Sequence, residues 1–101
     1  MPDSPHFHIN AVAFKEGDAW IAQGIEFDIV AHAHERAKLS SAFARAVLEN
    51  VAITRHLGRA ALEGIKPAPD YFREMFKRAK TEISPPSAIP HEPGITVRVV
   101  A

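Results

Sequence analysis

The amino-acid sequence predicts an α+β fold, with a mostly antiparallel three- to four-stranded sheet covered by one long helix in the order β-β-β-α-(α)-β. Three observations lead to this class. Apolar and polar residues alternate near the N-terminus, apolar residues recur every three to four positions from Leu39 to Leu57, and residues 95–100 form an apolar, β-branched run. Alternation is typical of half-buried strands, and the longer spacing indicates an amphipathic helix. The helix must cover an apolar surface, which the strands can supply.

Three short strands are expected before the helix. The first covers residues 6–14, where successive side chains point to opposite faces. Gly17 lies in the turn to the second strand, residues 19–23, because glycine accepts positive φ. Gly24 marks a bulge or bend before the third strand, residues 27–32.

The long helix is expected over residues 39–57. One face carries an apolar stripe, formed by Leu39, Phe43, Val47, Val51 and Leu57, with Ala42, Ala46 and Ile53 filling in. Gly58 follows as a C′ glycine after a histidine in the last turn. Ser40 or Ser41 could cap the N-terminus, but the helix could also begin before Lys38.

A second, shorter helix is expected within residues 67–80, after an extended proline-containing segment. Asp70 can cap it, and its apolar stripe, expected to pack at an edge of the sheet, is Tyr71, Phe72, Met75, Phe76 and Ala79. Residues 84–93 contain four prolines and are expected to form a loop.

Residues 95–100 are expected to form the last strand. A terminal strand this apolar promotes aggregation if it stays unpaired, so it should complete the sheet or pair with another copy. Together with a single covering helix, this predicts a homodimer or a higher homo-oligomer.

Length and composition set further bounds. The 101 residues suit one domain, 1–101, with the strands and long helix at 7–57 as its core. Cysteine is absent, which excludes disulfides and thiolate chemistry and suits a cytoplasmic location. No leader peptide and no apolar run long enough to span a membrane is seen. The net charge is zero, although residues 1–35 are acidic and residues 36–80 are basic. This uneven distribution indicates either an acidic sheet beside a basic helical layer or ordinary solvated faces.

Three segments carry a resemblance to a known family. Residues 17–22 read Gly-Asp-Ala-Trp-Ile-Ala, residues 24–31 read Gly-Ile-Glu-Phe-Asp-Ile-Val-Ala, and residues 39–43 read Leu-Ser-Ser-Ala-Phe. In this order they resemble the HicB family of antitoxins and its orphan relatives, over about residues 7–57 and more loosely 83–100. The connection at residues 32–38 is longer than in that family.

The resemblance implies a non-catalytic interaction protein. Its partner would be a small basic RNA-cleaving toxin, unless the chain is a solitary relative. HicB proteins that repress their own promoters carry a DNA-binding extension after the last strand, and none follows Val100 here. We therefore expect no specific DNA binding by this chain alone. The alternatives are a small hydrolase or nuclease, or an RNA-binding module, on the same scaffold.

Few residues suggest catalysis or metal binding. His32 and His34 would share a strand face and could offer two imidazoles to a metal, but two ligands do not close a site. Asp28 with a histidine and Ser40 or Ser41 could form a hydrolytic set, although serines at a helix start are usually caps. We expect no cofactor and no catalytic residue.

The second helix offers the candidate partner contacts Arg73, Lys77 and Arg78. They lie among aromatic residues, and aromatic rings beside cations could also bind nucleic acid by stacking on its bases. At helical spacing, however, aromatic residues more often pack on a core and leave the cations in water.

Overall fold

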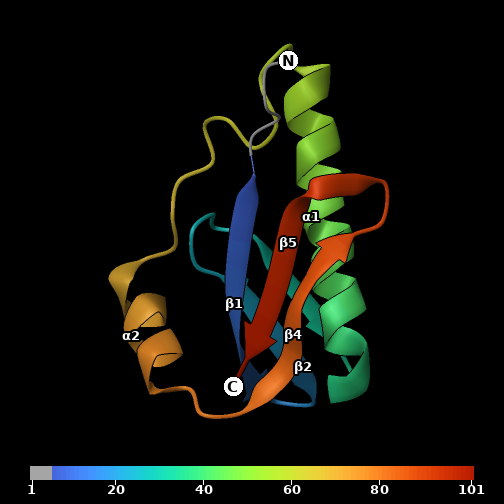
Figure 1. The fold of residues 1–101 in the computed structure, drawn as a ribbon. Coiled ribbons are helices and arrows are strands. Elements are labelled where there is room, and N and C mark those ends of the chain that lie inside the picture. Colours follow the sequence, from blue (N-terminus) through green and yellow to red (C-terminus); the bar gives the residue numbers. More distant parts are fainter. Residues whose placement is uncertain (1–5) are drawn as a thin grey trace.

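The computed structural model describes residues 6–101, which form one five-stranded sheet with a long and a short helix (Figure 1). The elements in chain order are β1 (Phe7–Glu16), β2 (Ala19–Gly24), β3 (Val30–Ala33), the 3-10 turn η1 (Arg36–Lys38), α1 (Leu39–His56), α2 (Asp70–Arg78), β4 (Glu82–Ile89) and β5 (Glu92–Val100). The strand order is β3-β2-β1-β5-β4. β1 and β5 pair in parallel, and the other neighbours pair antiparallel.

The sheet is mixed and has five strands, so the expectation of a mostly antiparallel sheet of three to four strands was wrong. The additional strand is β4, which occupies most of the proline-rich segment expected to be a loop. Pro85 and Pro86 have no backbone N–H to donate. Because β4 is an edge strand, only the side that faces β5 requires backbone donors, so the sheet tolerates these prolines. A two-residue turn, Pro90–His91, connects β4 to β5, and His91 has a φ of 68°.

β5 lies inside the sheet, between β1 and β4. Both of its sides are therefore paired within the chain, so β5 completes the sheet, which is the first of the two expected alternatives, and needs no second copy to pair it. β5 also begins at Glu92, three residues before the expected start, and is one of the longest strands.

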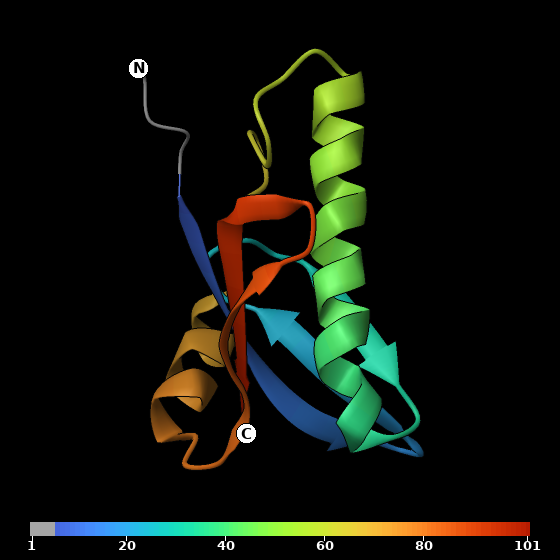
Figure 2. The same cartoon turned by 45° about the vertical axis from the view of Figure 1, so that its right-hand side comes forward.

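α1 agrees with the predicted helix to within one residue and covers one face of the sheet, as expected (Figure 2). Its apolar stripe is fully buried at Leu39, Phe43 and Val47. Ile53 and Leu57, also expected in the stripe, are largely exposed, and Thr54 is the buried residue at that end of the helix, so this part of the prediction was wrong. Facing the buried stripe are alternate residues of four strands: Ile9, Ala11, Ala13, Ala22, Ala31, Ile95, Val97 and Val99. The alanines on the sheet let the helix approach closely, so these side chains form the main core.

The C-terminal end of α1 has the predicted glycine geometry. Gly58 has a φ of 77°, and its amide donates to the carbonyl of Arg55 at 2.9 Å. The amide of Arg59 donates to the carbonyl of Thr54 at 2.9 Å, which completes a Schellman motif. The following loop is fixed by Leu62, which is 1% exposed and whose amide donates to the Thr54 hydroxyl.

α2 lies on the opposite side of the sheet from α1 (Figure 1, Figure 2). It packs beside the central strand β1, not at an edge of the sheet as expected. Pro69 is its N-cap residue and Asp70 is its first helical residue, with no side-chain cap hydrogen bond, so the predicted Asp70 cap was wrong. No helix within residues 6–101 has the length and apolar character needed to cross a bilayer.

Candidate protein-binding site

α2 is attached to the sheet by a small aromatic contact. The Phe72 ring stacks on Phe14 of β1, with ring centroids 6.0 Å apart. Met75 and Phe76 are half-buried, and no α2 residue is fully buried. The helix therefore rests on its support with much less burial than α1 has.

The outer flank of α2 borders a pocket of about 350 Å³, which we call the α2 pocket. It is lined by Tyr71, Glu74, Met75 and Arg78. Tyr71 is 69% exposed, and its ring lies edge-on to Phe72 at 5.2 Å between centroids. The pocket thus combines an aromatic ring, a flexible thioether and a guanidinium group at the surface.

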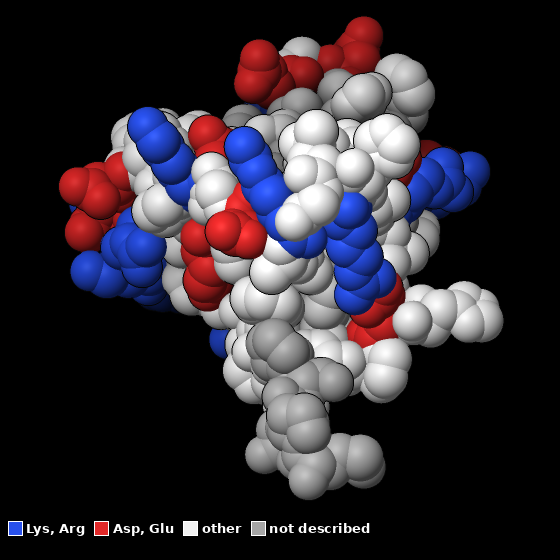
Figure 3. All heavy atoms as spheres, turned by 90° about the horizontal axis from the view of Figure 1, so that it is seen from above, with Lys and Arg blue, Asp and Glu red and all other residues white. Residues whose placement is uncertain are grey.

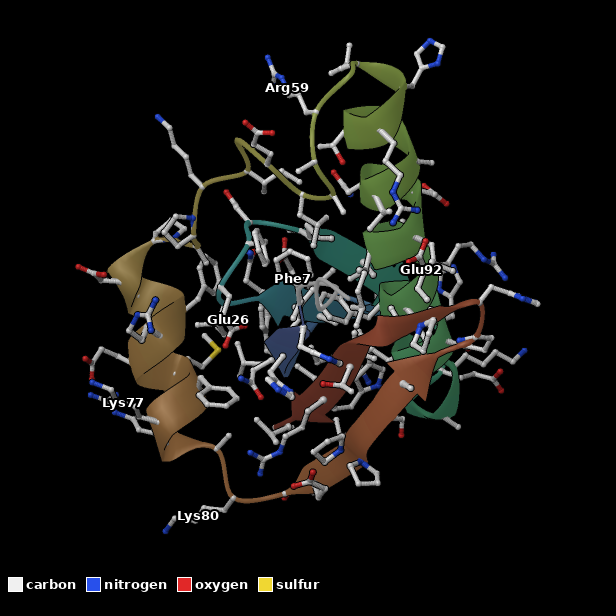
Figure 4. The ribbon with its side chains drawn as sticks, turned by 45° about the horizontal axis from the view of Figure 1, so that its top comes forward. Phe7, Glu26, Arg59, Lys77, Lys80 and Glu92 are labelled. Carbon is white, nitrogen blue, oxygen red and sulfur yellow. The ribbon has the colours of Figure 1, made fainter. Side chains whose placement is uncertain are left out.

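The structure separates the three predicted partner contacts. Arg78 lines the α2 pocket, whereas helical geometry places Arg73 and Lys77 on another flank. Lys77 approaches Glu74 at 3.4 Å, with both side chains largely exposed, and it points away from the sheet (Figure 4). Such an exposed pair contributes little to stability.

Tyr71 was expected to belong to the apolar stripe that packs on the sheet, but its side chain is exposed, so this expectation was wrong. A nine-residue helix cannot bury five large or apolar positions against one support, and Phe72 and Phe76 occupy the sheet side. A signal was present in the sequence, because residues 71, 75 and 78 are themselves spaced as a second stripe.

The candidate metal and hydrolytic residues do not form a site with a third partner. Only His32 lies in β3, and His34 follows the strand, both with exposed side chains. Within residues 6–101, no three His, Cys, Asp or Glu side chains cluster as metal ligands do. The Ser41 hydroxyl donates to the Lys38 carbonyl at 3.2 Å. Neither serine caps α1 through its side chain.

Glu26 and Asp28 hold the loop between β2 and β3. The Glu26 carboxylate accepts from the amide and the side chain of Asn10, each at 2.7 Å. Asp28 accepts from the buried Gln23 side chain at 2.8 Å. A Cβ at Gly24 would lie 2.6 Å from the Phe27 carbonyl oxygen, so only glycine fits this turn. These carboxylates are therefore occupied in holding the fold.

A second pocket, of about 210 Å³, lies beside the C-terminal end of α1. It is lined by Phe7, Arg55, Ala61 and Glu92 and by residues 93–95. Arg55 donates to Glu92 at 2.6 Å, and this hydrogen bond raises the pKa of Arg55. The cation is thus already neutralised by its neighbour (Figure 4 shows Glu92 beside α1).

Charges are mixed over the end of the molecule that Figure 3 shows, where Lys and Arg alternate with Asp and Glu. The basic residues of 36–80 are spread over η1, α1, α2 and the segments between them, and the two helices lie on opposite sides of the sheet, so these residues do not form one basic layer. Comparison of the chain with protein-family models, curated proteins and solved structures found no match.

Proposed function

We propose that this chain is a non-catalytic, HicB-like protein-interaction domain that binds its partner at the α2 pocket. One observation carries the proposal: Tyr71, Met75 and Arg78 line one concave surface on a helix with no buried residue. Tyrosine, methionine and arginine are enriched in the centres of protein interfaces, where a ring or guanidinium group fills a complementary pocket.

The weak attachment of α2 suits it for binding. Along its length, α2 is held by one aromatic stack and by half-buried side chains, while its ends are fixed by hydrogen bonds from the amide of Ala68 to the Ile25 carbonyl and from the amide of Lys80 to the Ala101 carbonyl. Its outer side chains are therefore free to adjust to a partner while the helix stays in place. Methionine adds adaptability because its thioether and three rotatable bonds fit irregular surfaces. The partner segment expected here has an apolar anchor between Tyr71 and Met75 and a carboxylate that reaches Arg78.

In the antitoxin form of this proposal, the partner is a small RNA-cleaving toxin encoded beside this chain. In the solitary form, it is another protein that presents the same kind of segment. The resemblance at residues 17–31 and 39–43 supports the HicB-like identity. The observed β-β-β-α beginning is compatible with it, and the additional strand β4 is a departure.

The test is to express the product of the neighbouring reading frame with this chain, and to measure affinity by calorimetry and growth rescue in cells. Tyr71→Ala is expected to cost about 2 kcal/mol, which weakens binding about 30-fold. Arg73→Ala, on the other flank of the same helix, is the matched control and should change affinity by less than about threefold. Equal losses in both variants, or neither binding nor rescue by the wild type, would contradict the proposal.

We also propose that the chain alone does not bind DNA specifically. Its α2 cations lie on two flanks and are partly offset by Asp70 and Glu74, whereas specific binding needs several phosphate contacts around one groove-reading element. A gel shift with the chain's own upstream region at about 150 mM salt should show no discrete complex that survives competitor DNA.

A further inference from the structure

The two edges of the sheet differ in how they are protected. β4 carries Pro85 and Pro86 and has register shifts against β5, features that prevent another strand from pairing with it. β3, at the opposite edge, reads Val-Ala-His-Ala, with no proline or glycine and with regular pairing to β2. β3 is therefore the edge that remains able to accept another strand.

A groove of about 240 Å³ runs between this edge and α1. β3 contributes residues 30–32, and α1 contributes Ala42, Arg45, Ala46 and Glu49. Val30 is 52% exposed beside the edge. The methyl side chains of the two alanines leave room along the helix.

The apolar surface continues along the same flank of α1. Ile53 follows Ala42, Ala46 and Glu49 at helical spacing and is 57% exposed. The two alanines and, two turns beyond Ala46, the exposed Ile53 give this flank an apolar strip outside the core, with Glu49 between them. An open strand edge, a groove and an apolar strip thus lie together.

The charges of the groove identify its occupant. It holds one cation, Arg45, and one anion, Glu49, one helical turn apart. Within residues 6–101, neither side chain is part of a salt bridge. A surface with one unpaired charge of each sign complements itself after a two-fold rotation, because each charge then meets its opposite.

We propose that two copies of this chain associate at this surface, with their β3 strands antiparallel across a two-fold axis. The two sheets become one continuous sheet, and the two α1 helices lie side by side. Arg45 of each copy faces Glu49 of the other, and Ala42 and Ala46 let the helices approach. The strand contributes only four residues, so the apolar strip on α1 must supply part of the contact area.

This inference is independent of the proposed binding at α2. β3 is separated from β1 by β2, and α2 lies on the other side of the sheet from α1. The dimer would present two α2 pockets, and loss of one surface leaves the other intact.

The test is sedimentation equilibrium of the full chain with charge reversals. Arg45→Glu and Glu49→Arg are each expected to weaken self-association by about tenfold or more, because like charges then face each other. Both positions are exposed, so the helix should be unchanged by circular dichroism. The swap of both residues in one chain should restore the dimer, and an equimolar mixture of the two single variants should form a heterodimer.

Arg73→Glu on α2 is the control and should leave self-association unchanged. The proposal would be overturned if the wild-type chain were still a monomer at a concentration 100-fold above that used in the calorimetric binding experiment. A stable dimer that neither reversal weakens, or single variants that remain monomeric when mixed, would also overturn it. A segment of another protein paired with β3 is the alternative occupant, and it corresponds to the monomeric outcome.

Discussion

The two sides of the sheet are covered in different ways. On one side, α1 buries Leu39, Phe43 and Val47 completely against alternate residues of four strands. On the other side, α2 buries none of its residues and makes one aromatic stack with Phe14. The first side holds the main core, whereas the second leaves apolar and charged side chains of α2 at the surface.

The difference follows from side-chain size and helix length. α1 has 18 residues and faces a sheet lined with alanines, so its large side chains can reach the strands. α2 has nine residues, and its sheet side carries the half-buried rings of Phe72 and Phe76, one of which stacks on Phe14. A short helix on a bulky support cannot bury all its apolar positions.

The largest expected effect comes from the α1 side. Phe43→Ala should lower the free energy of unfolding by about 3–5 kcal/mol, because it removes a fully buried ring and leaves a cavity. Urea unfolding monitored by circular dichroism measures the loss. A change under about 1 kcal/mol would mean that the α1 side is not the main core.

The matched change on the other side is Phe72→Ala. Its ring is half-buried and stacks on Phe14, so we expect a loss of about 1 kcal/mol in the same experiment. A loss as large as that of Phe43→Ala would break the comparison, because α2 would then be part of the core.

A smaller effect is expected where α1 ends. Gly58→Ala should cost about 1 kcal/mol, because φ at this position is 77° and a Cβ disfavours the left-handed region. A Cβ there would meet nothing within 4 Å, so the cost comes from the backbone alone. An unchanged or higher melting temperature would show that the Schellman end does not fix the helix terminus.

The smallest effect concerns an exposed ion pair on the α2 side of the sheet. The hydrogen bonds from Arg98 lower the pKa of the Glu82 carboxyl, so the ionised form favours the folded state. This contribution is present above the ordinary pKa of glutamate and is lost as pH falls through the lowered value. In thermal melts from about pH 6 to 3, the Arg98→Leu variant should lose less stability than the wild type. Parallel pH profiles would contradict this.

The sequence predicted the elements whose signals are local. The stripe from Leu39 and the glycine at position 58 predicted α1 and its end, and alternation predicted β1 with the correct faces. The topology required long-range information: the parallel pairing of β1 with β5 joins residues more than 80 positions apart. The strand β4 was missed because its prolines were interpreted as a loop, although an edge strand tolerates them.

The candidate site was predicted in part. The basic residues of α2 were predicted as surface residues, but Tyr71 was expected to be buried. That expectation failed because periodicity does not show how much of an apolar stripe the sheet will cover. The groove beside β3 depends on which strand lies at the edge, and this follows only from the strand order.

Native-state hydrogen exchange tests most directly whether α1 holds the fold while α2 is loosely attached. Within Leu39–His56, buried-face amides should exchange only through global unfolding, with the free energy measured by urea. Within Asp70–Arg78, amides should exchange through local opening at a free energy lower by at least about 2 kcal/mol. Exchange of both helices at the same free energy would contradict this account, because α2 would then open only when the whole domain unfolds.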